Sequence, residues 1–470
     1  MQIASVLGIS ATMLAAACGG SNHGNGSGGG GSDAGSASGG GGCVGSACVV
    51  DCVAMGKPET VVSGTVFAPN GTLPLFGINV YVPTRDPGPV PDGLTCARCS
   101  DSLPGEPLLS TVSDENGAFA LNGAPAGDNV PLVITTGKWR RQIVIPHVEA
   151  CATTTLAAAD TSLPRDRSQG DMPRIAIATG AADSLECLAR KLGVADSEIT
   201  TDRGTGHLHL YAGNGGKDQF KTGFPGGSGE KFSVAGDLWN SVDRLESYDI
   251  VMLSCEGAPY ADEKPQSAMA AVKSYVDAGG RLFLSHWHDI WISGEKNKPA
   301  HGLPEWEPLA TWTFNEAELP ANSSSLIDER GNPKGGAFAS WMLHVGGSTV
   351  RDRIDLQNQA PENGTVLSTG RTTCSGVDGN KVERWVYLPA DLGTPPPPPG
   401  GGTQNFQFTT PIEKDADQRC GKVVFSDMHV SGTSGQGLYP DSCGSTQLTP
   451  QEKALAFMFF DIASCVGVLL

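Results

Sequence analysis

Hydrophobic and polar residues follow two different periods along the chain. Between residues 59 and 160, short β-branched runs alternate apolar with polar side chains, which is typical of half-buried strands. Asn116-Gly117 supplies a turn signal between two of these runs. No helical period occurs here, so the pattern predicts an N-terminal all-β sandwich over residues 59–160. The predicted strands lie at 61–68, 77–82, 118–121, 130–135 and 141–145.

From residue 172 onward, continuous apolar runs alternate with amphipathic stretches. The continuous runs are typical of strands covered on both faces and lie at 174–180, 248–257, 281–286 and 422–427. Helices are predicted at 185–192, with Asp183 as N-cap, at 266–278 and at 449–463. The chain is therefore predicted to be multidomain, with an α/β doubly wound parallel sheet after the sandwich. The α/β domain is predicted to have its first part at 172–299, an insertion with a Pro-rich loop (Pro395–Pro399) at 300–402, and its last strand and helix at 403–470.

The first 58 residues have the character of an export signal and a tether. Ile3–Ala17 is uncharged and mostly apolar but shorter than the roughly 20 residues of a membrane-spanning helix, which favours a secretory signal. Leu14-Ala15-Ala16-Ala17-Cys18-Gly19 resembles the lipobox of bacterial lipoproteins, although its leucine lies four residues before the cysteine. The resemblance implies a signal peptide at 1–17 and a lipid on Cys18, while the alternative is a plain secretory signal. Residues 18–58 then form a Gly/Ser-rich tether with a cysteine cluster.

The net charge restricts which partners the chain can bind, and the cysteine content indicates the compartment in which it folds. The chain has 32 Lys and Arg against 50 Asp and Glu, a net charge of −18, so it lacks the basic footprint of a nucleic-acid-binding protein. It has 13 cysteines, and 12 remain if Cys18 carries a lipid. An even number of cysteines in an exported protein favours disulfide bonds.

Geometry restricts how these cysteines pair. Cys443 and Cys465 flank a predicted helix whose ends are about 22 Å apart, which is beyond disulfide reach. Because that helix returns from the far end of the strand after Cys420, we expect a Cys420–Cys465 bond. Cys96-x-x-Cys99 lies in a Pro/Gly-rich loop without a helix behind it, which favours structural disulfides over a redox or zinc pair.

Two regions of the chain resemble known families. Ser63-Gly64-Thr65-Val66, Gly77-Ile78-Asn79-Val80 and Asp114-Glu115-Asn116-Gly117-Ala118-Phe119 resemble the carboxypeptidase regulatory-like domain. That resemblance implies a transthyretin-like sandwich that accompanies other domains and usually carries no catalysis. Tyr248–Leu253, Val276–His286 and Gly421–Phe425 resemble the class I glutamine-amidotransferase-like fold, especially its trehalose-utilisation-type branch, which implies a flavodoxin-like sheet. Ser285-His286 stands where that family has its nucleophile, so the resemblance implies a degenerate member.

Ligands of open α/β sheets bind beyond the carboxyl ends of the strands. Cys255 is a candidate nucleophile there, with His286 or His429 as base, but it is also a candidate for a disulfide bond with Cys187. A metal site is another interpretation: His286, His288 and Asp289, joined by His429 or Asp427, have donors that suit a metal, and whether a metal binds stays open. The remaining interpretations are an organic ligand, such as a carbohydrate stacked on tryptophan, and histidines that are hydrogen-bonded at an aromatic core edge. The candidate residues are Cys255, Glu256, Ser285, His286, His288, Asp289, Asp427 and His429.

Together these observations favour a lipid-anchored protein of the cell envelope, on the outer membrane or the cell surface. We expect it to be non-catalytic, to need no cofactor, and to bind a glycan, a peptide or a protein partner. The alternative is an extracytoplasmic hydrolase or metal-dependent enzyme that uses the Cys255/His286/His429 edge. Both site hypotheses require the side chains of Cys187, Cys255, His286, His288 and His429 to converge on one pocket.

Overall fold

The computed structural model describes residues 48–294, 302–313, 319–358, 368–389, 402–430, 437–441 and 443–467. The proposed signal peptide, Cys18, the tether as far as residue 47 and the Pro395–Pro399 run lie outside the described residues. All described residues belong to a single compact unit that spans Gly42–Leu470. Among them, no helix has the length and apolar composition needed to cross a bilayer.

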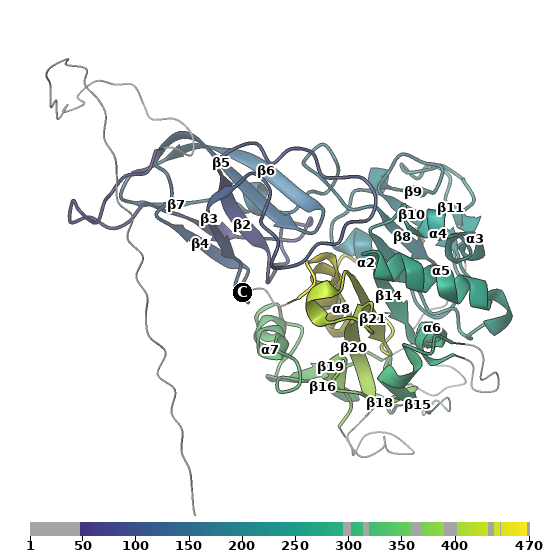
Figure 1. Cartoon of the computed structure of the whole chain (residues 1–470). Coiled ribbons are helices and arrows are strands. Elements are labelled where there is room, and N and C mark those ends of the chain that lie inside the picture. Colours follow the sequence, from purple (N-terminus) through teal and green to yellow (C-terminus); the bar gives the residue numbers. More distant parts are fainter. Residues whose placement is uncertain are drawn as a thin grey trace, which may run out of the picture. The chain divides into compact units, whose positions relative to one another are not determined.

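Two sheets form the N-terminal part of this unit, which we call the two-sheet region (residues 61–155; Figure 1). One sheet has the strand order β4-β1-β7 and the other has the order β3-β2-β5-β6. Val62, Val80 and Leu132 come from both sheets and are fully buried in one shared core, as apolar positions of alternating strands should be. The elements are β1 (Val61–Thr65), β2 (Asn79–Pro83), β3 (Pro107–Val112), β4 (Ala118–Asn122), β5 (Gly127–Thr136), β6 (Trp139–Val148), β7 (Thr153–Thr155) and the short helix α1 (Ala158–Thr161).

A large mixed sheet forms the C-terminal part. Among the described strands its order is β12-β10-β8-β13-β14-β21-β20-β19-β16-β17, with β9 beside β10. Its strands are β8 (Ile175–Ala178), β9 (Ile199–Thr201), β10 (Leu208–Ala212), β12 (Ser233–Val234), β13 (Ile250–Leu253), β14 (Arg281–Ser285), β16 (Ser324–Ile327), β17 (Arg353–Asp355), β19 (Glu383–Tyr387), β20 (Thr403–Thr410) and β21 (Gly421–Ser426). Two small sheets, β11 (Gln219–Phe220) with β22 (Leu438–Tyr439) and β15 (Ala310–Trp312) with β18 (Cys374–Val377), lie outside it.

The mixed α/β class predicted from the sequence is confirmed, but the wholly parallel sheet is wrong. The half from β12 to β21 is parallel, whereas β21, β20, β19, β16 and β17 pair antiparallel. The segment that connects β20 to β21, residues 411–420, is too short for a crossover helix, so these two strands form an antiparallel pair. Three further antiparallel strands then extend the sheet.

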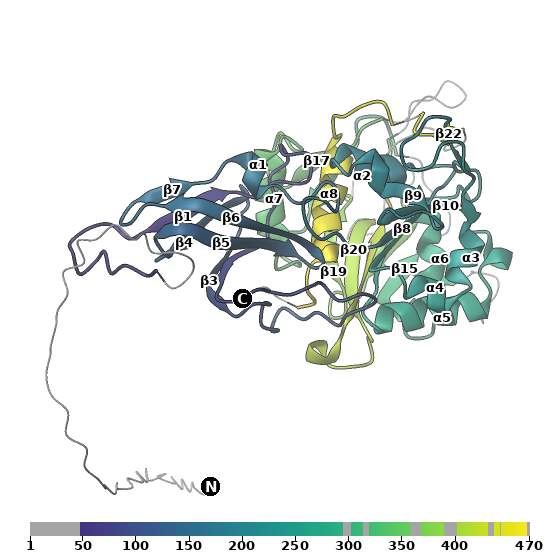
Figure 2. The same cartoon turned by 90° about the horizontal axis from the view of Figure 1, so that it is seen from above.

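Helices cover both faces of the parallel half (Figures 1 and 2). Met252 and Val424 point into the core that contains helices α2 and α8, whereas their neighbours Val251 and Val423 point into the core of α3 and α5. This division follows from the two-residue period of a strand. The helices are α2 (Leu185–Lys191), α3 (Ala235–Trp239), α4 (Val242–Leu245), α5 (Gln266–Asp277), α6 (Ile290–Ser293), α7 (Gly335–His344) and α8 (Pro450–Ala463).

The segment expected to be an insertion, residues 300–402, continues the large sheet where it is described. It contributes β16, β17 and β19, and its helix α7 packs beside α8 through Phe338 and Phe457, whose ring centroids are 4.7 Å apart. Few residues of this segment alternate cleanly, which is why the sequence pattern did not indicate the strands.

Helix α8 joins the two-sheet region to the large sheet. Phe457 on this helix stacks on Phe76 at 5.7 Å, and Trp139 at the start of β6 packs against Phe459 and Phe460. The helix predicted at 449–463 is present, and a capping box formed by Thr449 and Glu452 stands at its N-terminus. The hydrophobic core is therefore shared between the two parts.

Four disulfide bonds have both cysteines among the described residues: Cys52–Cys151, Cys96–Cys420, Cys99–Cys465 and Cys187–Cys443. The predicted Cys420–Cys465 bond is wrong, although both cysteines lie beside the same loop. That loop, from the two-sheet region, carries Cys96 and Cys99 to them, and so each pairs with a loop cysteine instead. Cys96 and Cys99 are structural, as expected.

The candidate Cys187–Cys255 bond is also wrong. Cys187 lies on the face of α2 that packs into the α8 core, where the segment before α8 supplies Cys443. Cys255 is a free thiol.

Gly137 lies where the turn between β5 and β6 packs against the end of α8, so its substitution tests how close this contact is. It has φ of +54°, and an added Cβ would lie 2.0 Å from the carbonyl oxygen of Ala463. We expect Gly137→Ala to lower the free energy of unfolding by about 3 kcal/mol, because the turn or the helix end must move. Gly123→Ala is the matched control, since Gly123 has φ of +74° with open space around it and should lose only about 1 kcal/mol. Urea unfolding measures both, and equal losses would contradict the close packing.

Candidate functional site

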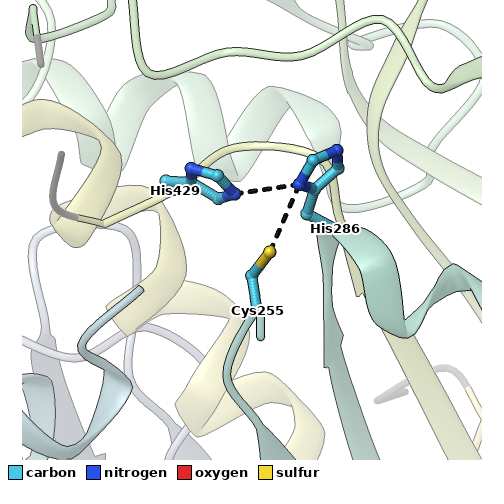
Figure 3. A group of neighbouring side chains, drawn as sticks. All are labelled: Cys255, His286 and His429. Carbon is cyan, nitrogen blue, oxygen red and sulfur yellow. Dashed lines mark hydrogen bonds between the residues drawn. The ribbon is translucent and has the colours of Figure 1, made fainter. Parts of the chain in front are cut away.

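Three neighbouring parallel strands, β13, β14 and β21, carry the central residues of the site. Cys255 lies two residues after β13, His286 directly follows β14, and His429 lies three residues after β21. The carboxyl ends of parallel strands meet at one edge of a sheet, and the three side chains converge there (Figure 3). We call these three residues the Cys-His-His cluster.

The imidazole of His286 lies between the other two side chains. Its Nδ1 is 3.3 Å from the Sγ of Cys255 and 3.1 Å from the Nε2 of His429. One donor atom from each residue lies within 4.8 Å of the others. The exposed fractions are 0% for Cys255, 2% for His286 and 3% for His429, so the cluster is closed off from bulk solvent.

His286 has an unusual backbone conformation. Its φ of +42° lies in the left-handed region, which residues other than glycine rarely adopt. The residue stands where β14 ends and the 3-10 turn His286–Asp289 begins. Figure 3 shows its ring directed toward Cys255 and His429. Such strained positions persist where the surroundings hold them, and they are concentrated at functional sites.

A second contact fixes the His286 ring from its other side. Nε2 of His286 is 3.1 Å from the hydroxyl of Thr373, and the backbone N–H of Thr373 donates to Asp427 at 2.8 Å. If Nε2 carries the ring proton and donates to Thr373, the lone pair of Nδ1 points into the cluster. Histidine metal ligands are commonly oriented in this way.

His429 is a neutral imidazole at physiological pH. Burial, reinforced by the positive charge of Arg371, holds the pKa of His429 well below its ordinary value. Its ring therefore offers a lone pair rather than a positive charge to the cluster.

Ser285 is not a member of the cluster. Its hydroxyl donates to Asp183 at 2.6 Å, and the other carboxylate oxygen of Asp183 accepts from the backbone N–H of Val430 at 3.0 Å. Asp183 was expected to cap α2, but the N-cap position falls to the next residue and has no side-chain cap. Asp183 instead connects the residue before His286 to the residue after His429.

The buried carboxyl group of Asp183 makes stability depend on pH. Burial raises the pKa of Asp183 to about 7, against the opposing effect of its hydrogen bonds. Between about pH 4 and 7 the folded protein keeps a proton that the unfolded chain has lost, so stability due to this group falls as pH rises.

We therefore expect Asp183→Asn, which cannot ionise, to gain stability relative to the wild type on going from pH 4.5 to pH 7.5. Unfolding by guanidinium chloride in the presence of a chelator measures this difference at both pH values. Parallel stability curves for the two proteins would show that Asp183 does not titrate in this window.

His288 and Glu256 belong to a different group from the Cys-His-His cluster. The metal ligands expected from the sequence, His286 with His288 and Asp289, therefore do not converge in the described chain. His288 Nε2 is 3.0 Å from the carbonyl oxygen of Ser254, and its Nδ1 accepts from the indole of Trp291. Glu256 pairs with the buried ammonium of Lys264 at 2.7 Å. Burial, with the charge of Lys264, holds the pKa of His288 well below its ordinary value. His288 is thus a satisfied histidine at an aromatic core edge, while Glu256 lines a separate cleft of about 520 Å³.

The two remaining candidate carboxylates, Asp427 and Asp289, lie outside the Cys-His-His cluster. Asp427 accepts from the backbone N–H groups of Thr373 and Cys374. Burial raises the pKa of Asp289 to about 8. Cys374, the other free cysteine of the described residues, is buried outside the cluster, and burial raises its thiol pKa well above the ordinary value.

Sequence reasoning missed Thr373 and the bridging role of Asp183. Thr373 lies in the segment that was expected to be an insertion, and nothing in its local pattern distinguishes it. The cleft around Glu256 also includes Asn214, whose backbone N–H donates to that carboxylate at 2.8 Å. The glycine-rich run Gly213–Gly216 is a local signal that could have indicated this loop, but the sequence analysis drew no prediction from it.

Comparisons with known proteins identify no family for the chain. No protein-family description matches it, and no curated protein does. A cytoplasmic protein from Salmonella typhimurium aligns with 61% of this chain and 98% of its own, at 10% identity and a TM-score of 0.30. Two interface mutants of a type II cohesin–X-dockerin complex from Acetivibrio cellulolyticus align with 30% of this chain and 75% of theirs, at 17% and 18% identity and TM-scores of 0.15. Scores this low support no inference, so the site is interpreted from its own geometry.

Proposed function

We propose that the chain is a lipid-anchored protein of the cell envelope that binds a transition-metal ion between Cys255, His286 and His429. The observation that carries the proposal is the convergence of Sγ, Nδ1 and Nε2 of these residues on one buried point.

Hydrogen bonding alone does not explain this arrangement well. A neutral imidazole nitrogen has either one proton or one lone pair, yet Nδ1 of His286 lies in contact range of both a thiol and a second imidazole. A metal ion removes the conflict, because each donor atom then directs its own lone pair at the ion. With metal–nitrogen bonds of about 2.0–2.1 Å and metal–sulfur bonds of about 2.3 Å, the donor atoms of a tetrahedral site lie about 3.3–3.6 Å apart. The observed separations of 3.1 and 3.3 Å are close to these values.

The donor set indicates which metals fit. One thiolate and two imidazoles suit Zn²⁺ or copper and disfavour Ca²⁺ and Mg²⁺, which prefer oxygen ligands. The contact between His286 and Thr373 supplies the outer hydrogen bond that orients a ligating histidine.

Burial favours binding over catalysis. A hydrolytic metal site keeps an open position for water and substrate, whereas all three side chains here are at most 3% exposed. The alternative is a hydrolase with Cys255 as nucleophile, His286 as base, and Thr373 and Asp427 as orienting groups; the His286–Thr373 contact favours it. In that mechanism the imidazole of His429 has no chemical role, although its Nε2 lies 3.1 Å from Nδ1 of the base His286.

The compartment and partners form the second part of the proposal. The lipobox-like segment supports a lipid on Cys18, and four disulfide bonds in the described chain support an oxidising compartment, on the outer membrane or the cell surface. We retain the carboxypeptidase regulatory-like assignment of the two-sheet region and the degenerate amidotransferase-like assignment of the α/β part as proposals. Binding of a glycan, peptide or protein partner is proposed with them.

Metal analysis tests the function directly. The purified chain, dialysed against Zn²⁺ or Co²⁺ and then against metal-free buffer, should retain about one equivalent per molecule. The Co²⁺ form should show a thiolate-to-metal charge-transfer band, because Cys255 is a ligand. Retention below about 0.2 equivalents would overturn the proposal, and fast alkylation of Cys255 in the metal-free native protein would favour the hydrolase.

A further inference from the structure

A second cavity, of about 930 Å³, lies at the opposite edge of the large sheet from the Cys-His-His cluster. Its walls include residues at the amino-terminal ends of β13 and β14, residues of β2 and β3, and the loop from Pro89 to Pro104. Ligand cavities for molecules of drug size occupy about 300–1,000 Å³, so the volume is appropriate for an organic molecule. The cavity shares no lining residue with the Cys-His-His cluster.

Two guanidinium groups stand together on the wall of this cavity. Arg281 donates to the carbonyl oxygen of Cys420 at 2.5 Å, and Arg98 Nη2 is 3.7 Å from the Sγ of the same cysteine. Arg281 also donates to the carbonyl oxygens of Gly279 and Ser464. Within the described part of the chain, neither guanidinium has a carboxylate in ion-pair range, and Nε of Arg98 has no hydrogen-bond partner.

The other charged groups on the wall do not neutralise this pair. Lys138 forms an ion pair with Asp249, with 2.6 Å between Nζ and Oδ1. Arg140 forms an ion pair with Asp171. Asp101 accepts from the backbone N–H of Arg98 rather than from its side chain. The wall therefore has four basic side chains, Arg98, Lys138, Arg140 and Arg281, and two acidic ones, Asp101 and Asp249.

The rest of the wall is apolar and held in place. Proline and aliphatic side chains line it, namely Pro89, Val90, Pro91, Leu103, Pro104 and Val112. The loop that carries most of them is fastened by the Cys96–Cys420 and Cys99–Cys465 bonds and by a hydrogen bond from Arg140 to the carbonyl oxygen of Gly88. A wall fixed in this way binds without a large ordering cost.

We propose that this cavity binds an organic carboxylate whose apolar body lies against the proline-rich loop and whose carboxylate is held by Arg98, with the charge of Arg281 behind it. Guanidinium groups recognise carboxylates through paired, charge-assisted hydrogen bonds.

Titration with matched ligand pairs tests the proposal. The probes are a panel of apolar organic acids that includes N-acetyl-Leu-Leu, each compared with its neutral C-terminal amide, and inorganic phosphate. Calorimetry on the full chain should find acids that bind at least about tenfold more tightly than their amides. If no acid exceeds its amide, or if phosphate alone binds, the proposal is overturned.

Two variants assign the binding to the cavity. Arg98→Gln removes the charge at a partly exposed position and should weaken the best acid at least about tenfold, with thermal unfolding confirming that the variant folds. Ser100 lies in the same loop but outside the lining of the cavity, so Ser100→Ala should bind as the wild type does. Unchanged affinity in Arg98→Gln would exclude the assigned site, and neither result depends on whether the Cys-His-His cluster binds metal.

Discussion

Replacing Cys255 with serine should lower the affinity of the protein for Zn²⁺ or Co²⁺ by at least about a hundredfold, since even loss of an outer partner of a metal ligand costs about 10–100-fold. The physical reason is that the thiolate is the anionic donor of the cluster, and a serine hydroxyl stays protonated and binds these ions weakly. The thiolate charge-transfer band of the Co²⁺ form should disappear with it. Competition against a chromophoric chelator measures the affinity.

Cys374→Ser is the matched control for this variant. Cys374 is the other buried free cysteine of the described chain, and it lies outside the cluster. Its replacement should change the fold's stability by a similar amount and leave metal affinity unaltered. His429→Gln should weaken binding but keep the charge-transfer band, because the sulfur ligand remains. If Cys255→Ser and Cys374→Ser retain metal equally, the cluster does not bind it.

Removing the two bonds that fasten the Pro-rich loop should be the other large effect. With Cys96, Cys99, Cys420 and Cys465 all changed to serine, we expect the free energy of unfolding to fall by about 4 kcal/mol or more, because loss of one native disulfide typically costs about 2–5 kcal/mol. The bonds join residues 324 and 366 positions apart, so their loss frees long loops in the unfolded chain. All four cysteines are changed because otherwise Cys420 and Cys465 would be free to pair with each other.

Equilibrium unfolding under non-reducing conditions measures this loss. Ser102→Ala, in the same loop with both bonds intact, should shift stability by less than about 0.5 kcal/mol. A fourfold variant as stable as the wild type would mean that core packing around α8 alone holds the loop in place. Metal affinity serves as an internal check, since the cluster lies at the other edge of the sheet and should be little changed.

The strongly periodic elements of the fold were predictable from the sequence. The apolar run 281–286 and the amphipathic helix predicted at 449–463 correspond to β14 and α8, because burial on both faces of a strand and on one face of a helix leaves a clear local pattern. The rule that ligands of open α/β sheets bind beyond the carboxyl ends of the strands also indicated where Cys255, His286 and His429 lie in the fold. These inferences need only local sequence and parallel pairing.

The rest depended on contacts between residues far apart in the sequence. The loop that carries Cys96 and Cys99 crosses to Cys420 and Cys465, and no local pattern shows that crossing. The separation of His286 from His288 comes from a 3-10 turn at a left-handed residue, whereas an extended strand would place both rings on one face. The bridge made by Asp183 likewise spans more than a hundred positions to Ser285 and more than two hundred to Val430.

The pattern of disulfide bonds has a consequence for how the protein withstands proteolysis. Cys52–Cys151, Cys96–Cys420 and Cys99–Cys465 enclose overlapping stretches of chain. Any single cut of the backbone between Cys52 and Cys465 therefore leaves two pieces that remain covalently joined. A protease that nicks an exposed loop releases no fragment, and the nicked molecule migrates at full size until a reductant separates its pieces.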